Sequence, residues 1–466
     1  MPKGLAKDLI HLLGRRMVAW HPEDVNSYAS DATHTFAPRK EPDAVVLPET
    51  AKDVSRVLAY ASEHGVFVTP RGAGSGLSGG STPIRGGLVV DTKRMNHILE
   101  INKGNMTASV ECGVVTAKLH NAVEPLGLFY PPDPQSMSVC TLGGNVATRA
   151  GGPRGVKYGT TGHYVLGLEV VLPDGSIITP GGVCVKNSVG YDLTHLFTGS
   201  EGTLGIITKV NLRLLPLPPS HATAVVACQT VEQAARIVSE IIASGTVPAM
   251  LEFISQMAAL VMNAVISPPL ALDSEAYLLM DMDGTPEQVR ADAARLLGLC
   301  RDMGAKDVRV VTDEKEAKTY WDARAALFPS ILTMAKKVIT EDVTVPRDKI
   351  PEFVRAIQAL SAETGMLIGI AGHAGDGNMH PSILFGEINA DQEKKAQEAI
   401  TKIIATGLSL GGTISGEHGV GLHKSGFLHW QLGPTQIRVM KSIKAAIDPK
   451  GIMNPGKIWP DGGNAA

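Results

Sequence analysis

Two histidines flank an Asp-Gly pair in the segment GHAGDGNMH, residues 372–380. Asp376-Gly377 between two apolar runs is a strong signal for a two-residue β-hairpin turn. Such a turn would place His373 directly opposite His380, with their Cβ atoms ~5 Å apart on one face of a sheet. Two imidazoles at that separation could share one divalent metal ion. A hydrogen-bonded histidine pair is the alternative that the spacing leaves open.

An acidic residue and a third histidine stand together in SGEHGVG, residues 415–421. Glycines on both sides of Glu417 and His418 allow the backbone to approach a ligand closely. Glu417 could complete a set of two histidines and one carboxylate with coordination positions left for a substrate. A solvated Glu-His pair is the alternative.

The segment PRGAGSGLSGGS, residues 70–81, is rich in glycine. Glycine allows positive φ, so several backbone N–H groups can point at one spot and bind a pyrophosphate. The nicotinamide fingerprint requires GxGxxG at the start of a helix. Here a strand is expected next, at Leu88–Asp91, so the run predicts a phosphate cradle without a Rossmann site. A glycine-rich surface loop is the alternative.

Two further glycine-rich runs follow, at residues 140–175 and 199–208. Their small residues leave room for a flat ring system or a ribityl chain, and Thr141, Asn145 and Thr148 offer hydrogen bonds. Three such runs in one domain favour a large cofactor over three ordinary turns.

Composition describes an ordinary globular protein. Of 466 residues, 44% are apolar and 19% are charged, and 43 basic against 46 acidic residues give a net charge of −3. This balance argues against nucleic-acid or membrane-surface binding through bulk charge. The five cysteines are scattered, which excludes a local zinc or iron–sulfur motif and fits a reducing compartment. The apolar stretch near the N-terminus is too short and polar for a signal sequence, and no apolar window is long enough for a membrane span. We therefore expect a cytoplasmic protein.

Coarse patterns divide the chain into an α+β architecture with a boundary at the proline-rich run 214–222. We expect a first domain at 1–217, a second at 218–425 and a C-terminal helix and tail at 426–466. In the first domain, helices are expected at Ala51–His64 and Thr116–Leu126. The expected strands there are Ala44–Leu47, Val66–Thr69, Leu88–Asp91, Ala108–Cys112, Leu168–Leu172 and Ile206–Leu215.

The second half alternates strands and helices in a ferredoxin-like order. No internal repeat is apparent in the sequence. The expected strands are Ala222–Cys228, Met250–Ile254, Ala276–Met282, Val308–Val311, Met366–Ala371 and Asn378–Leu384. The expected helices are Val231–Ala243, Thr285–Met303, Arg347–Thr364, Ala390–Leu408 and Pro434–Ile447.

Seven motifs occur in order: PRGAGSGLSGG, TLGGNVATRAGG, GLEVVLPDG, GSEGTLGIIT, GHAGDGNMH, GEHGVG and NPGK. Together they resemble the FAD-linked 2-hydroxyacid dehydrogenase family, which contains flavoprotein D-lactate dehydrogenases and the D subunit of glycolate oxidase. The wider group comprises the vanillyl-alcohol-oxidase-type flavoproteins. The resemblance implies an FAD-binding domain of that type plus a ferredoxin-like substrate (cap) domain, with the C-terminal segment returning to the FAD domain.

The resemblance implies non-covalent FAD, since no histidine occurs in residues 70–81. The residues it implies for FAD binding are Pro70, Arg71, Gly72, Ala73, Gly74, Ser75, Gly76, Leu77, Pro134, Ser138, Thr141, Gly144, Asn145, Ala147, Glu201, Gly205, Ile207 and Asn454.

For the reaction, the resemblance implies that His373, His380 and Glu417 bind a divalent metal ion, which could be zinc, iron or manganese. His418 would be the catalytic base and Arg324 the cation that binds the substrate carboxylate. The implied chemistry is oxidation of a small D-2-hydroxyacid to the 2-oxoacid, by metal-assisted proton abstraction and hydride transfer to flavin N5. For Arg324, the alternative is an ordinary arginine on a helix surface.

The substrate expectation is D-lactate first. The second lysine found in 2-hydroxyglutarate enzymes is not clearly matched here, where Lys336, Lys337 and Thr340 lie near its place. With no iron–sulfur, haem or membrane-spanning motif, electrons would pass to an external acceptor such as an electron-transferring flavoprotein, an iron–sulfur subunit or a quinone. The alternatives are the catalytic subunit of glycolate oxidase, a metal-dependent hydrolase and a flavin-binding electron-transfer module. The oligomeric state, a homodimer included, is left open.

Overall fold

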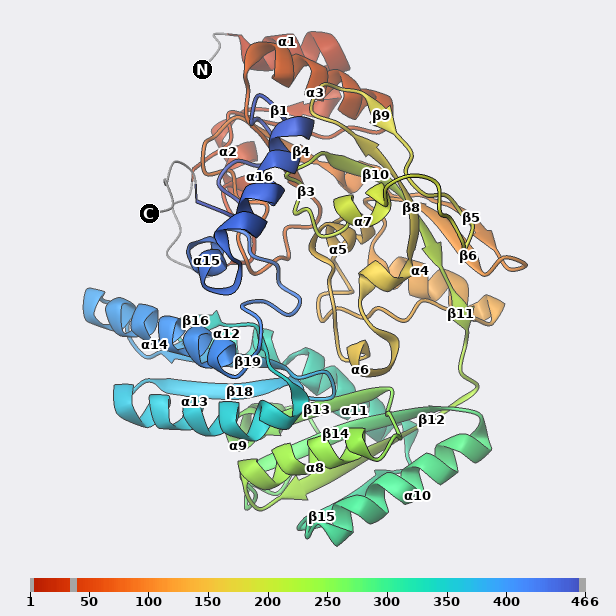
Figure 1. Ribbon diagram of the computed structural model, residues 1–466, viewed down its shortest axis with the longest axis vertical. Coiled ribbons are helices and arrows are strands. Elements are labelled where there is room, and N and C mark those ends of the chain that lie inside the picture. Colours follow the sequence, from red (N-terminus) through yellow and green to blue (C-terminus); the bar gives the residue numbers. More distant parts are fainter. Residues whose placement is uncertain (1–3, 34–39, 461–466) are drawn as a thin grey trace. The chain divides into compact units, whose positions relative to one another are not determined.

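The computed structural model describes residues 4–33 and 40–460. The chain folds into two compact units: unit 1 is built from residues 1–150, 160–217 and 417–466, and unit 2 from 151–159 and 218–416 (Figure 1). The chain therefore passes between the units four times, and both termini belong to unit 1.

Unit 1 contains two main sheets. In the first, of order β1-β2-β4-β3, the strands β2, β4 and β3 pair in parallel and β1 pairs antiparallel at the edge. The second, of order β5-β6-β10-β8-β9, is antiparallel throughout, and β7 pairs with β11 separately. The strands are β1 (Val18–Ala19), β2 (Ala44–Val46), β3 (Val68–Arg71), β4 (Leu88–Asp91), β5 (Ile98–Asn102), β6 (Thr107–Glu111), β7 (Leu128–Phe129), β8 (Val165–Val171), β9 (Ile177–Ile178), β10 (Ile206–Arg213) and β11 (Leu215–Pro216).

The helices of unit 1 include the three predicted at 51–64, 116–126 and 434–447, of which the second ends at Val123. The α-helices are α1 (Leu5–Leu13), α2 (Pro22–Val25), α3 (Ala51–His64), α4 (Thr116–Val123), α5 (Leu142–Thr148), α7 (Leu193–Phe197), α15 (Leu428–Gln431) and α16 (Pro434–Ile447).

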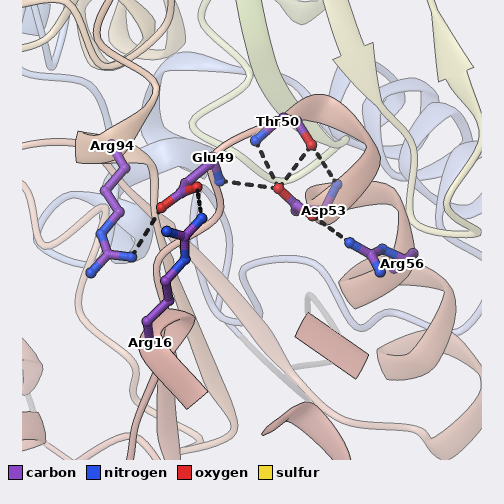
Figure 2. Close-up of polar contacts among 6 residues, drawn as sticks. All are labelled: Arg16, Glu49, Thr50, Asp53, Arg56 and Arg94. Atoms are coloured by element: carbon purple, nitrogen blue, oxygen red, sulfur yellow. Dashed lines mark hydrogen bonds and ion pairs between the residues drawn. The ribbon is translucent and has the colours of Figure 1, made fainter. Parts of the chain in front are cut away.

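Helix α3 begins where its sequence dictates. The Thr50 hydroxyl accepts from the Asp53 N–H at 3.2 Å, and the Asp53 carboxylate accepts from the Thr50 N–H at 2.9 Å, which forms a capping box. Arg56 pairs with Asp53 at 2.5 Å one turn later. Figure 2 shows this network beside Glu49. The helix ends at Gly65, whose φ of 64° lies in the left-handed region that glycine adopts freely.

The first glycine-rich run, residues 70–81, and the residues between it and β4 contain no helix, as expected. The second run, residues 140–175, does contain a helix, because α5 forms inside it. Thr141 caps this helix by accepting from the Gly144 N–H at 3.4 Å. The local capping signal, T-L-G-G-N, outweighs the low helix propensity of two glycines over a helix of only seven residues.

Unit 2 is built on one eight-stranded sheet, in which seven strands follow the order β15-β12-β14-β13-β18-β19-β16 and β17 also pairs with β19. Its strands are β12 (Ser220–Cys228), β13 (Met250–Ser255), β14 (Ala276–Gly284), β15 (Asp307–Val311), β16 (Lys337–Thr340), β17 (Val343–Thr344), β18 (Leu367–His373) and β19 (Asn378–Phe385). Its α-helices are α6 (Gly155–Tyr158), α8 (Val231–Ala243), α9 (Gln256–Met262), α10 (Pro286–Asp302), α11 (Glu314–Ala325), α12 (Leu327–Met334), α13 (Ile350–Thr364) and α14 (Ala390–Ser409).

The strand order reveals a structural duplication that the sequence does not display. Elements β12-α8-β13-β14-α10-β15 form a ferredoxin-like unit of order β15-β12-β14-β13. Elements β16-α13-β18-β19-α14 repeat this order without a fourth strand, as β18-β19-β16. The two halves join through antiparallel pairing of β13 with β18. The ferredoxin-like expectation therefore holds, and it applies twice.

One face of this sheet carries polar residues. Successive side chains of a strand point to opposite faces, and the register pairs Ile254 with Ala371 and Ala371 with His380. Glu252, two residues before Ile254, therefore shares its face with His380. Toward the other end of the sheet, this face is covered by α9, α11 and α12, which form one apolar cluster with Ile254 and its neighbours.

Candidate active site

The hairpin that carries His373 and His380 forms, but with a longer turn than predicted. His373 pairs with Asn378, and His380 pairs with Ala371, so the expected direct opposition of the two histidines is wrong. The turn comprises the four residues 374–377, because the N–H of Asp376 bonds back to the carbonyl of His373 at 3.2 Å and continues the chain reversal. The register differs by two residues, which keeps both histidines on one face of the sheet.

The two imidazoles still meet, as diagonal neighbours on that face. Their ring centroids lie 5.1 Å apart with the ring planes at 83°. A nitrogen of His373 and a nitrogen of His380 lie within 4.8 Å of each other. Two nitrogen donors at this separation suit a divalent transition-metal ion, so the residues present fit the metal that the resemblance implied.

A fully buried carboxylate, Glu252 on β13, contacts the imidazole of His373. One of its oxygens lies 2.7 Å from His373 Nδ1, and the other lies 2.6 Å from Arg324 Nη2. Glu252 is 0% exposed and Arg324 is 5% exposed. Burial acts to raise the pKa of Glu252, but its interactions with His373 and Arg324 together lower it below its ordinary value. Arg324 is therefore no helix-surface arginine, since it belongs to a buried ion pair.

A second buried carboxylate, Asp342, lies beside His380. Its Oδ2 accepts from the Ser415 hydroxyl at 2.8 Å and from the Gly416 N–H at 2.9 Å. Its Oδ1 lies 4.0 Å from His380 Nδ1. Asp342 thus fixes the chain at Gly416, and the next two residues of the chain are Glu417 and His418. These two open the last stretch of unit 1, in an irregular loop.

Sequence reasoning missed both carboxylates. Glu252 had a signal, because it is a charged residue inside the otherwise apolar strand MLEFI, and a buried charge requires a partner. Asp342 had none, since its partners Ser415 and Gly416 are distant in the chain.

In unit 1, the first glycine loop packs tightly against the start of α5. A Cβ atom on Gly72 would lie 2.3 Å from Thr141 Oγ1 and 3.8 Å from Gly144 Cα. Gly74 has a φ of 70°, and a Cβ there would meet the guanidinium of Arg71 at 2.2 Å. The glycines are therefore required by contacts within the protein, and they leave backbone rather than side chains at this surface. Exposed backbone of this kind fits the pyrophosphate of a dinucleotide.

At the C-terminal end of the first glycine-rich run, near Gly80, the buried side chains of Glu201 and Asn454 form hydrogen bonds with the backbone. Glu201 is 8% exposed, and its carboxylate accepts from the N–H groups of Val420 and Gly421 at 2.9 and 2.8 Å. Burial raises the pKa of Glu201, and those two hydrogen bonds offset only part of the rise. Asn454 Nδ2 donates to the carbonyls of Gly80 and Glu201, at 2.8 and 2.7 Å. Thus three segments distant in the sequence converge within unit 1.

Two properties of Asn454, its side-chain oxygen and its backbone conformation, favour a bound ligand beside it. Its side-chain oxygen is buried and has no hydrogen-bond donor among the residues that the structure describes. Its φ of 42° is left-handed, which costs free energy for a non-glycine residue. An unsatisfied acceptor in a strained backbone is typical of a cofactor site, so the residues of unit 1 fit FAD.

The remaining residues predicted for FAD binding also lie in unit 1. The Ser136 hydroxyl, between Pro134 and Ser138, lies 3.4 Å from the Ser75 hydroxyl of the glycine loop. The Glu201 N–H donates to the carbonyl of Ala147 at 2.9 Å. Asn145, Gly205 and Ile207 lie in α5, before β10 and in β10, and Pro70, Arg71, Ala73, Gly76 and Leu77 belong to β3 and its loop. No residue of this set that the structure describes falls in unit 2.

Comparison with known proteins agrees with this architecture. Residues 217–458 match the family model described as "FAD linked oxidases, C-terminal domain", and residues 42–181 match "FAD binding domain". The chain is 43% identical to glycolate oxidase subunit GlcD of Bacillus subtilis, over 93% of this chain and 92% of that protein. It is 37% identical to D-lactate dehydrogenase of Archaeoglobus fulgidus, over 96% of this chain and 98% of that protein.

Solved structures show the same fold. A crystal structure of p-cresol methylhydroxylase with bound substrate superimposes with a TM-score of 0.83 at 18% identity, covering 98% of this chain and 97% of that one. Within residues 4–33 and 40–460, no helix has the length and apolar character needed to cross a membrane. The family resemblance and the fold class expected from the seven motifs are confirmed, and FAD is the cofactor that both family models imply. The chain therefore belongs to the family of FAD-linked oxidases.

Proposed function

We propose that this protein oxidises a small D-2-hydroxyacid, D-lactate first, to the 2-oxoacid and passes the electrons to an external acceptor. The relatives support the class of substrate, because they include both a glycolate oxidase subunit and D-lactate dehydrogenases. The observation that carries the proposal is the pair of imidazoles on one sheet face, backed by buried carboxylates. A glycine-rich FAD unit alone would not require such a pair.

In this proposal His373, His380 and Glu417 hold a divalent metal ion. The separation of the two histidine nitrogens supports this, and Asp342 fixes the chain one residue before Glu417. Such an ion supplies Lewis acidity, which lowers the pKa of a bound α-hydroxyl group. Zinc, iron and manganese all accept nitrogen and oxygen donors, so the donor set does not select among them.

FAD would be held without a covalent link and would supply the acceptor for the hydride that leaves the substrate. We assign its pyrophosphate to the loop Arg71–Leu77 and its ring system to the neighbourhood of Thr141, Asn145 and Glu201. Asn454 would complete the site with its buried amide oxygen.

His418 takes the hydroxyl proton as general base, and Arg324 contributes the positive charge that a substrate carboxylate requires. D-Lactate is favoured over 2-hydroxyglutarate because neither Lys336 nor Lys337 matches the second lysine of 2-hydroxyglutarate enzymes. Thr340 in the same segment is engaged with the Ser382 hydroxyl at 2.9 Å.

The acceptor is external in this proposal. The name of one relative, a glycolate oxidase subunit, makes a partner subunit a natural candidate beside an electron-transferring flavoprotein or a quinone.

The test uses purified, FAD-loaded protein and its His418→Ala variant. We expect D-lactate to bleach the flavin absorbance of the wild type under anaerobic conditions, faster than L-lactate, glycolate or 2-hydroxyglutarate does. The variant should retain FAD and lose bleaching by ~10²–10⁴-fold, the usual contribution of a general base. Bleaching of the variant at the wild-type rate would refute the base assignment, and preferred bleaching by glycolate would identify glycolate as the substrate. A colourless wild-type protein would refute the flavoenzyme assignment and favour a metal-dependent hydrolase.

A further inference from the structure

We propose that Glu252 and Arg324 act together as a positioning pair for His373, so that Arg324 is the counter-ion of Glu252 in addition to the cation proposed for the substrate carboxylate. This inference rests on the proposed metal role of His373. It assigns a task to Glu252, a residue that no motif singled out.

The geometry of the pair supports this role. Glu252 bridges His373 Nδ1 at 2.7 Å and Arg324 Nη2 at 2.6 Å, one oxygen to each. Glu252 lies on β13, two residues before Ile254 of the apolar cluster, and Arg324 lies near the end of α11, which packs in that cluster. Rigid elements therefore hold all three side chains.

The chemistry of the contact fixes the tautomer of His373. A carboxylate oxygen can only accept, so the imidazole places its proton on Nδ1 and leaves the lone pair on Nε2. A carboxylate behind a histidine ligand orients the ring and increases its basicity, and loss of such a partner usually costs 10–100-fold in metal affinity.

The charge balance explains why Arg324 belongs to this unit. A fully buried carboxylate next to a neutral imidazole would be an uncompensated charge, which is strongly destabilising. Arg324 cancels it, so the triad carries no net charge while His373 stays neutral. Removal of Arg324 should therefore disturb His373 through Glu252, the carboxylate that Arg324 pairs with.

The experiment measures Zn²⁺ affinity by competition with a chelator, on FAD-loaded protein, for wild type, Glu252→Gln, Arg324→Met and the double variant. Replacement of Zn²⁺ by Co²⁺ adds a visible ligand-field spectrum as a second readout, which does not depend on turnover. Asp283→Asn is the matched control, because Asp283 is a buried carboxylate on β14 that pairs with Lys157 and accepts from the Tyr158 hydroxyl.

We expect Glu252→Gln and Arg324→Met each to weaken Zn²⁺ binding at least tenfold. The double variant should lose no more binding free energy than the two single variants lose together. Asp283→Asn should bind Zn²⁺ as wild type does. The Co²⁺ spectrum should change in both single variants. If Arg324 is only a clamp, Arg324→Met will raise KM for D-lactate and leave Zn²⁺ affinity unchanged, which overturns the proposal. Wild-type Zn²⁺ affinity in Glu252→Gln overturns it as well.

Failure of the metal role itself would look different. In that case wild type and His380→Ala would bind Zn²⁺ equally weakly, and both this inference and the metal part of the proposed function would fall. Should Glu252→Gln not fold, Glu252→Asp replaces it. That variant keeps the charge but shortens the reach to His373, so it should also lose at least tenfold in Zn²⁺ affinity, and wild-type affinity there would contradict the proposal.

Discussion

Replacing Gly72 by alanine tests whether the first glycine loop is held against α5 by close backbone packing. The new Cβ would lie 2.3 Å from Thr141 Oγ1, and real Cβ atoms essentially never come closer than 3.0 Å to such an atom. The contact must therefore open by at least 0.7 Å, the difference between the two values. Thr141 caps α5, so a rotation that relieves the contact gives up the cap.

The expected cost follows from these two routes. Loss of the cap costs ~1 kcal/mol, and overpacking without rotation costs about 1–3 kcal/mol. Reduced entropy of the unfolded chain returns about 0.4–1 kcal/mol. We expect a net loss of roughly 1–2 kcal/mol and a Tm lower by roughly 2–8 °C for a unit of this size. Where this cost falls on the loop conformation that binds FAD, the affinity for FAD should drop by roughly 5- to 30-fold, since ~1.4 kcal/mol is tenfold in affinity.

The assay is thermal unfolding of the apoprotein together with FAD titration. Gly182→Ala is the control, because nothing lies within 4 Å of a Cβ at that position of the same unit, so its Tm should not change measurably. In a Thr141→Ala background, the Gly72→Ala substitution should cost much less, because the obstructing oxygen is gone. An equal cost in both backgrounds, or no cost in the first, would refute the packing argument.

Two further predictions concern a helix cap and the cysteines. Burial acts to raise the pKa of Asp53, but hydrogen bonds from Thr50 and Arg56 lower it on balance, so the folded carboxylate stabilises α3 above its unfolded pKa. Asp53→Asn should therefore cost most near neutral pH in urea unfolding, and the difference from wild type should shrink as the pH falls below about 4; a constant difference would contradict this. A maleimide should label one thiol per folded chain, Cys184, because it is exposed while the other four cysteines are buried, and labelling of two or more would count against the structure. Burial raises the pKa of three of those thiols to about 12, namely Cys112, Cys228 and Cys300.

The sequence predicted best those elements whose ends are determined locally. The helices at 51–64, 231–243 and 434–447 have the predicted bounds, because each starts at a cap or a proline. Helices α11 and α12 and strand β16 were missed. The pattern of α11 is dominated by charged residues, so its apolar periodicity is weak, and its burial comes from tertiary packing against α9 and α12.

The candidate site was predictable only in part, for physical reasons. Residue types and spacing identified His373 and His380. The register of β18 against β19 depends on hydrogen bonds inside the turn, and these favour a turn of four residues over one of two. The partner of His373 comes from another strand 121 residues away, and no local pattern encodes that distance. The duplication in unit 2 was invisible because topology persists after residue similarity has been lost.

The interleaving of the two units has a consequence for synthesis on the ribosome. Val68 of β3 pairs with Met453, and the Asn454 N–H donates to the carbonyl of Val68 at 2.7 Å. By the time Met453 emerges, the whole of unit 2 has already left the exit tunnel and can have folded. The flavin unit is thus the first to be started and the last to be finished. Its cofactor should be bound stably only after Met453 has left the tunnel, and a nascent chain stalled before Met453 should have a complete unit 2 and no stable hold on FAD.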